Sequence, residues 1–403
     1  MHTHLPMSRN MDVLNQEYAL GNITFPNRLA IQPMEGADGR LDGAPDDLAI
    51  RRYERFAKSG AGLIWFEAVA VRHDGRANPR QLWMHDKNLD DFKRLVSRIR
   101  EIALKEGNPN PVIIMQATHS GRYSRPDGPL EPMIACNNPI YEGENTLPPN
   151  RIVSDDTLRQ LEECYATITR QAIDCGFDGI DVKACHRYLN SELLAAHNRP
   201  GPYGGPLENR MRFFKNTTDN ARAVAVPGFL VTSRINIYDG IPYPYGFGVS
   251  PDSDPDLTEP IQMIKAMGFE MINITMGNPY FNPQVNRPTD TEGVVRMYSL
   301  TKEIKQAVPE VAIVASAPTY MQDESPYLAA GAVADGYADM VGFGRMAFAY
   351  PEFARDILND NFNKKMTCIT CGKCSELMRG SRAGCVVRDR IYTELYRQLK
   401  AER

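Results

Sequence analysis

This sequence of 403 residues lacks long apolar runs, a surplus of basic residues and an N-terminal pattern typical of a secretory signal. No apolar run has the length that a membrane-spanning helix needs, so we expect no membrane partner. Lys and Arg number 46 against 50 Asp and Glu, and a net charge of −4 offers no electrostatic footprint for nucleic acid. The opening MHTHLPMSRNMDVLNQ lacks the basic-then-apolar layout of a secretory signal. Composition therefore excludes membrane and nucleic-acid functions and leaves a globular protein.

The cysteines are unevenly distributed, and the spacing of the last four indicates a metal centre. Those four form the pattern C-x2-C-x2-C-x10-C, which places three thiolates on one loop with a fourth in reach: Cys368, Cys371, Cys374 and Cys385. Thiolates are the ligands of cuboidal iron–sulfur clusters. Structural zinc more often uses two separated pairs, so the spacing favours a [4Fe–4S] cluster, with zinc as the alternative and disulfides behind both. We expect redox chemistry and a cytoplasmic location, where thiols stay reduced.

Eight short runs rich in β-branched residues recur along the chain, with amphipathic helical stretches between many of them. Strands that alternate with helices form parallel sheets, and eight such units predict a closed (β/α)8 TIM barrel of the α/β class. We assign residues 1–350 to this barrel and residues 351–403 to a C-terminal cysteine-rich extension. The predicted strands are 28–34, 61–70, 111–119, 176–184, 229–236, 271–276, 311–317 and 339–345.

Between the strands, one helix is predicted over residues 89–102, and the next begins after Ser154, a favourable N-cap residue, and ends near Gly176. The segments 120–150 and 238–257 are long loops that would line the rim of the barrel mouth. Polar residues collect where six of the strands end. Carboxyl ends of barrel strands meet at one mouth, where the active sites of this fold lie. The sequence therefore predicts an active site there.

Several ordered motifs on these strand ends resemble the Old Yellow Enzyme family of flavin reductases, in its iron–sulfur branch, which includes 2,4-dienoyl-CoA reductase and trimethylamine dehydrogenase. The resemblance runs from Leu20 to Cys385. The motifs are FPNRLAIQPM, Q-x2-H-x-G-R at 116–122, H-x-Y-L with R-x3-YGG-x2-ENR-x-RF at 186–213, and GFGR at 342–345. The resemblance implies FMN over the barrel mouth and NAD(P)H as an electron donor.

The resemblance also implies which residues would bind FMN. Gln116 would bond the pyrimidine edge of the flavin, and Arg234 would place a positive charge near N1 and O2. The phosphate would lie at the last two strands, although VASAPTY lacks the glycine-rich turn that many relatives have there. The full set of expected flavin contacts is Pro33, Met34, Glu35, Ala68, Gln116, Arg234, Ser316, Ala317, Gly344 and Arg345.

On the substrate side, the resemblance assigns catalytic roles to Lys183, His186 and Tyr188. The first two would hold the oxygen of the substrate, with Lys183 where many relatives have His, and Tyr188 would protonate Cα. Glu35 departs from the small residues of relatives, and it would either pair with Lys183 or lower the flavin potential. A structural ion pair of Lys183 with Asp181 or Glu35 is the alternative.

These observations predict an ene reductase, which reduces the C=C bond of an α,β-unsaturated carbonyl or carboxyl compound by hydride transfer from flavin N5. No G-x-G-x-x-G follows a predicted strand, so we expect electrons either directly from NAD(P)H or through the cluster from a separate electron-donor protein. Two other functions remain open: an amine-dehydrogenase-type enzyme that exports electrons, and a non-catalytic electron-transfer module. A homo-oligomer is also open.

Overall fold

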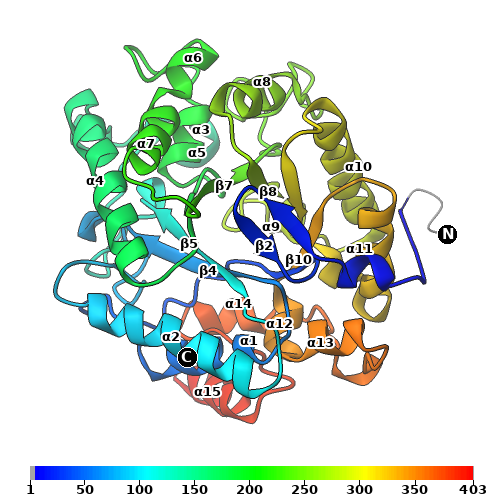
Figure 1. Ribbon diagram of the computed structural model, residues 1–403. Coiled ribbons are helices and arrows are strands. Elements are labelled where there is room, and N and C mark those ends of the chain that lie inside the picture. The colour runs from blue at the N-terminus through cyan, green and yellow to red at the C-terminus, as the bar shows by residue number, and fades with distance from the viewer. Residues whose placement is uncertain (1–4, 403) are drawn as a thin grey trace.

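The computed structural model describes residues 5–402, and these form a closed barrel of eight parallel strands surrounded by helices (Figure 1). The strand order is β10-β3-β4-β5-β6-β7-β8-β9, in which each strand neighbours the next one in the sequence and β10 closes the ring on β3. The predicted (β/α)8 barrel is confirmed. Each predicted strand contains one observed strand: β3 Leu29–Ile31, β4 Leu63–Ala70, β5 Val112–Thr118, β6 Gly179–Val182, β7 Leu230–Asn236, β8 Met271–Thr275, β9 Ala312–Ala315 and β10 Met340–Phe343.

The outer ring consists of helices whose apolar faces pack on the strands. The helix that begins after Ser154 has the predicted N-cap, since the Ser154 hydroxyl accepts a hydrogen bond from the Thr157 N–H at 3.1 Å. The long helices are α1 Asp47–Ala57, α2 Leu89–Lys105, α4 Asp155–Asp174, α7 Arg212–Arg222, α8 Thr258–Met267, α10 Thr291–Ala307 and α11 Ser325–Ala334. Short helices lie in the loops: α3 Pro139–Glu142, α5 Leu189–Leu194, α6 Leu207–Arg210, α9 Pro283–Asn286 and α12 Arg345–Ala349.

A hairpin that the sequence did not predict closes the N-terminal end of the barrel. Strands β1 Tyr18–Leu20 and β2 Ile23–Phe25 pair antiparallel across this end, where β2 crosses the ring in the view of Figure 1. Phe25 is fully buried against an apolar cluster to which seven of the eight barrel strands contribute, including Leu63, Trp65 and Met271. This end of the barrel is therefore a closed hydrophobic core.

Alternate residues of the strands point into the barrel, and their polarity changes along its axis. At the hairpin end they are apolar, as Val112 and Leu230 are. Two to four residues further along each strand they are polar, so that β5 reaches Gln116 and β7 reaches Arg234. The first interior residue of a strand therefore belongs to the apolar core, and the last one lies at the mouth of the barrel.

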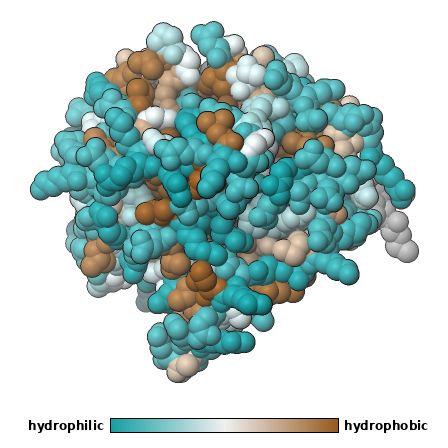
Figure 2. All heavy atoms as spheres, turned by 60° about the horizontal axis from the view of Figure 1, so that its bottom comes forward, coloured by the Kyte–Doolittle hydropathy of each residue, from teal (hydrophilic) through white to brown (hydrophobic). Residues whose placement is uncertain are grey.

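The C-terminal segment packs beside α1 at one side of the barrel, at the bottom of Figure 1. It contains α13 Phe353–Leu358, α14 Lys373–Met378 and α15 Arg390–Ala401. An ion pair joins Arg51 of α1 to Asp389 at 2.8 Å and anchors α15. Figure 2 shows the face that carries this segment, where hydrophilic residues predominate and hydrophobic ones form small separate patches. Its treatment as a separate domain stays a prediction.

Among residues 5–402, no helix combines the length and the apolar composition that crossing a membrane requires.

Candidate active site

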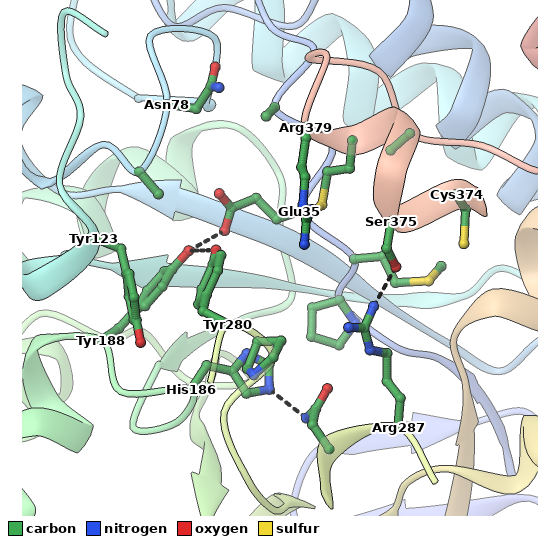
Figure 3. Close-up of a pocket in the computed structure, with 18 of the residues that line it drawn as sticks. Glu35, Asn78, Tyr123, His186, Tyr188, Tyr280, Arg287, Cys374, Ser375 and Arg379 are labelled. Atoms are coloured by element: carbon green, nitrogen blue, oxygen red, sulfur yellow. Dashed lines mark hydrogen bonds between the residues drawn. The ribbon is translucent and has the colours of Figure 1, made fainter. Parts of the chain in front are cut away.

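A cavity of about 530 Å³ opens at the carboxyl ends of the strands (Figure 3). Its walls come from the ends of β3, β5 and β6, from the loop after β8, and from α12 and α14. The predicted site residues that line it are Pro33, Met34, Glu35, Gln116, Lys183, His186, Tyr188, Arg345 and Cys374. The predicted convergence of strand-end residues at one mouth is therefore observed.

The turn that follows β6 carries three of these residues, and its backbone is strained. His186 and Arg187 both have left-handed backbone conformations, with φ of 62° and 61°, which residues other than glycine rarely adopt. Buried ion pairs hold the turn: the Arg187 guanidinium donates to Asp239 at 2.8 Å and also contacts Glu192. Because Arg187 is anchored beneath the turn, His186 and Tyr188 are directed into the cavity on either side of it.

The phenol of Tyr188 lies at the centre of a hydrogen-bonded chain. Its Oη is 2.9 Å from Oε2 of Glu35 and 2.9 Å from Oη of Tyr280, and Figure 3 shows the three groups side by side. Burial raises the pKa of Tyr188 well above its usual value, and the neighbouring Glu35 raises it further. Burial also raises the pKa of Glu35, against the opposing effect of Lys183. Tyr188 therefore keeps its proton over the whole physiological pH range.

Lys183 and His186 flank Tyr188 on the substrate side. The Lys183 ammonium lies 3.8 Å from the centroid of the Tyr188 ring, and burial lowers the pKa of Lys183. His186 Nε2 accepts a hydrogen bond from the Asn286 amide at 3.1 Å. Burial and the charges of Lys183 and Arg234 hold the pKa of His186 well below its usual value, so this ring is neutral with its proton on Nδ1. Among the residues that the structure describes, no carboxylate forms an ion pair with Lys183.

The residues expected around a flavin fit such a group. Arg234 is 7% exposed, its Nε has no hydrogen-bond partner, and its Nη1 lies 3.5 Å from the Pro33 carbonyl oxygen. A buried guanidinium without a carboxylate is costly unless a ligand supplies the missing acceptors. The Gln116 amide nitrogen donates to Asp181 at 2.6 Å, which leaves its carbonyl oxygen for a ligand. The Arg234 guanidinium suits the electron-rich N1 and O2 atoms of an isoalloxazine ring, and the free carbonyl oxygen of Gln116 suits an N–H of its pyrimidine edge.

The remaining residues that we expect to contact the flavin differ in whether they line the cavity. Arg345 lines the cavity, whereas the lining does not include Ala68, Arg234, Ser316, Ala317 and Gly344. Ala317 has φ of 66°, so the chain after β9 makes the left-handed turn for which a glycine would be preferred. The Ser316 hydroxyl is bonded to the Gln32 amide at 3.0 Å. The loop therefore retains a tight turn without the glycine-rich sequence.

The four C-terminal thiols gather near one end of the cavity. Burial raises the pKa of Cys368 to about 11, and the charges of Cys374 and Cys385 add to this shift. Cys371 in turn affects Cys374 and Cys385. Within residues 5–402, however, no three His, Cys, Asp or Glu side chains converge closely enough to hold one metal ion. A cuboidal cluster binds each sulfur to a different iron atom and so needs wider spacing, and for this chain it stays a prediction.

Several cavity residues were missed by the sequence analysis. The loop after β8 brings Tyr280 against Tyr123, with ring centroids 4.2 Å apart, and brings Arg287 to the Ser375 hydroxyl. Arg379 extends from α14 into the cavity in Figure 3, and Arg125 also lines it. A tyrosine in an N-P-Y-F-N-P loop at a strand end was the available signal. The contacts themselves depend on how the loop folds back.

A (β/α)8 barrel with an unpaired guanidinium, an amide and a buried phenol at its mouth has the architecture of a flavin-dependent oxidoreductase. Comparison with known proteins supports this class. The model of the NADH:flavin oxidoreductase / NADH oxidase family matches residues 16–363. The chain belongs to this family, and its predicted likeness to Old Yellow Enzyme and its prediction as an oxidoreductase are confirmed at that level.

Among curated relatives, the NADH oxidase of Thermoanaerobacter brockii is 26% identical over 423 residues, which cover 98% of this chain and 58% of that protein. The solved complex of 2-naphthoyl-CoA reductase with 2-naphthoyl-CoA has a TM-score of 0.80 at 20% identity, covering 96% of this chain and 58% of the other. An old yellow enzyme homologue from Zymomonas mobilis has a TM-score of 0.66 at 20% identity, over 86% and 92%. The two structures show the fold alone. The chain spans little more than half the length of the first two.

Proposed function

We propose that this protein is an FMN-dependent ene reductase that acts on an activated C=C bond, conjugated to a carbonyl or carboxyl group. The observation that carries the proposal is Tyr188, a protonated phenol at the barrel mouth beside a lysine and a neutral imidazole. Such a constellation suits proton delivery to a carbanion next to a polarised oxygen. When bound, FMN would supply the hydride that this reaction needs.

Lys183 and His186 would hold the carbonyl or carboxyl oxygen of the substrate. The Lys183 ammonium is a charged donor, and the Nδ1–H of neutral His186 is a second donor. Both stabilise the negative charge that develops on this oxygen while the C=C bond is reduced. Tyr188 would then deliver its proton to Cα. Arg234 and Gln116 would hold the flavin edge, and Arg345 would contribute to the phosphate site.

The charges of the cavity favour this proposal over an amine dehydrogenase. Glu35 is the only carboxylate among the described residues that line the cavity. Lys183 and four guanidinium groups line it as well, those of Arg125, Arg287, Arg345 and Arg379. A cationic amine would be repelled by this field, in spite of the tyrosines that could surround it. A neutral or anionic unsaturated substrate is attracted instead. The relative that acts on an acyl-CoA thioester, 2-naphthoyl-CoA reductase, is consistent with such a substrate.

For the electron supply, we propose a [4Fe–4S] cluster held by the four C-terminal cysteines, with NAD(P)H or an electron-donor protein upstream. The mutual influence of the thiols supports this, as does Cys374, which belongs to both the thiol group and the cavity wall. Most of the exposed charged residues between 364 and 390 are basic, including Lys365, Lys373 and Arg388, while the acidic side chain of Glu376 is 41% exposed. An acidic donor protein would be attracted to this surface.

The proposal is tested by anaerobic purification, analysis of flavin, iron and sulfide, and an activity screen over unsaturated ketones, acids and thioesters. We expect one FMN, about four irons and four sulfides per chain, with reduction of at least one substrate class. Stopped-flow mixing with NADH and NADPH separates direct reduction from delivery by a partner. A protein purified gently without any flavin would overturn the proposal. A Cys371→Ser variant that keeps its full iron content would exclude the cluster assignment.

A further inference from the structure

The hydrogen bonds of Tyr188 limit what its single proton can do. If Glu35 is ionised, its carboxylate can only accept, so the Tyr188 hydroxyl donates to Oε2 of Glu35 and points away from the substrate. The Tyr280 hydroxyl then donates to Tyr188. In that state the phenol has no proton aimed at a reacting carbon, and the carboxylate beside it opposes formation of a phenolate.

A protonated Glu35 reverses this arrangement with the same 2.9 Å separation. Its O–H then donates to the phenol oxygen, the Tyr188 proton is free to point at the substrate, and the phenolate that forms is stabilised by two donors. The partly buried position of Glu35 favours this state, since burial raises its pKa. The charge of Lys183, on the end of β6, opposes it.

The other groups around Glu35 come from three further elements. Tyr280 belongs to the loop after β8, and Arg125 and Arg379 line the same cavity from the loop after β5 and from α14. Neither guanidinium forms an ion pair with Glu35 among the described residues. The Lys183 ammonium lies over the Tyr188 ring, and within the described part of the chain it has no hydrogen bond to the Tyr188 hydroxyl through which it could return a proton.

We propose that Glu35 is the proton store of this site and that Tyr280 connects it to solvent. This rests on the proposed ene reduction. The C=C bond gains hydride at Cβ and the Tyr188 proton at Cα, the phenolate takes the proton of the Glu35 carboxylic acid, and the carboxylate regains one from water through Tyr280 and Tyr188. Tyr280 suits the last step because it is 47% exposed while its hydroxyl reaches the buried phenol. In this role Glu35 acts through its hydrogen bond to Tyr188 and is a positioning residue.

The test is Glu35→Gln, which keeps the side-chain volume and can donate an N–H to the phenol but cannot transfer a proton to it. In the wild type, multiple-turnover reduction should fall as pH rises through the pKa of Glu35. In the variant this pH dependence should vanish, with steady-state turnover about tenfold lower at acidic pH, while the first turnover, which uses the Tyr188 proton, stays fast. Glu35→Asp should restore part of the pH dependence.

Glu162→Gln is the matched control, because Glu162 is also bonded to a tyrosine, Tyr203, at 2.8 Å, and burial also raises its pKa. It lies outside the cavity, and the variant should keep the wild-type pH profile. A Glu35→Gln protein with an unchanged pH profile and unchanged turnover would overturn the proposal.

Infrared titration adds a readout that needs no substrate. One component of the C=O band of protonated carboxyl groups should titrate with pH in the wild type, be lost in Glu35→Gln, be kept in Glu162→Gln, and shift in Tyr188→Phe. A Glu35 ionised throughout would refute the proton store, whatever the activity screen finds. If the band behaves as expected but no unsaturated compound is reduced, the proposed reaction fails while the coupling of Glu35 and Tyr188 stands.

Discussion

The two ends of the barrel are built from the same eight strands but to opposite chemical purposes. At the hairpin end the interior is apolar and closed by Phe25. At the mouth the interior holds buried charges that form no ion pair with a carboxylate of residues 5–402, above all Arg234 and Lys183. An unpaired buried charge costs stability, whereas apolar burial contributes it. The closed end therefore stabilises a fold whose open end is strained for binding and chemistry.

Among tests of this difference between the two ends, we expect the largest effect from Tyr188→Phe. We expect turnover to fall by about 10² to 10⁴-fold, the usual contribution of a positioned general acid, with stability and flavin content near the wild type. Steady-state kinetics with flavin absorbance and thermal unfolding measure both. Tyr203→Phe is the control, since it removes another phenol bonded to a glutamate. Wild-type turnover in Tyr188→Phe would show that the mouth works without this acid.

The opposite result is expected at the closed end for Phe25→Ala. Loss of a fully buried aromatic side chain should lower the free energy of unfolding by about 3–5 kcal/mol, with turnover unchanged well below the transition. Denaturant unfolding measures the loss. Leu41→Ala, at a side chain that is 74% exposed, should change little. A large drop in turnover at 25 °C with small loss of stability would contradict the division between the two ends.

Between the two ends lies Asp181, which accepts hydrogen bonds from Trp65 at 2.7 Å and Gln116 at 2.6 Å. Burial raises the pKa of Asp181 to about 6. The folded state then holds a proton that the unfolded state has lost above its own pKa of about 4. Stability should therefore fall between about pH 4 and pH 6, by at most about 3 kcal/mol, and then level off. Unfolding measured across this range should show the slope, and Asp181→Asn should flatten it. If the stability of the wild type relative to Asp181→Asn rose with pH over this range, the raised pKa of Asp181 would be contradicted.

The smallest effect is expected for Arg234→Met. Flavin should bind about tenfold more weakly, yet the flavin-free protein should unfold at an unchanged or higher temperature, because an unpaired buried charge has been removed. Flavin titration and thermal unfolding of the flavin-free protein measure both. In contrast, Arg210→Met breaks hydrogen bonds to two carbonyl groups and an ion pair with Glu259, and should destabilise. Marked destabilisation of both variants would mean that Arg234 is structural.

The barrel could be predicted from the sequence because parallel strands buried on both faces leave short, nearly continuous apolar runs, as at 61–70 and 111–119. The hairpin could not, since its three-residue strands are too short to show a period. It closes the barrel through contacts with seven strands, from Ala30 of β3 to Met340 of β10, which lie far apart in the sequence.

In the site, residues on strand ends such as Gln116 and Lys183 could be predicted, because the fold fixes where they point. Residues that reach the cavity from loops could not. The hydrogen bond of Glu35 to Tyr188 joins positions 153 residues apart, and the sequence analysis had paired Glu35 with Lys183 or with the flavin instead. Tyr280 and Arg379 likewise depend on a loop and a tail whose courses only the folded chain defines.

The hydrogen bond between Arg287 and Ser375 ties the loop after β8 to α14, and Ser375 directly follows Cys374 in the sequence. One wall of the reaction chamber is thus borrowed from the segment that carries the thiols. Loss of that segment would remove the thiols that we propose as cluster ligands, and it would also remove one wall of the cavity, so that the cavity would select less strictly among molecules. The same C-terminal segment therefore affects both the choice of molecules that fit the cavity and the state of the four thiols.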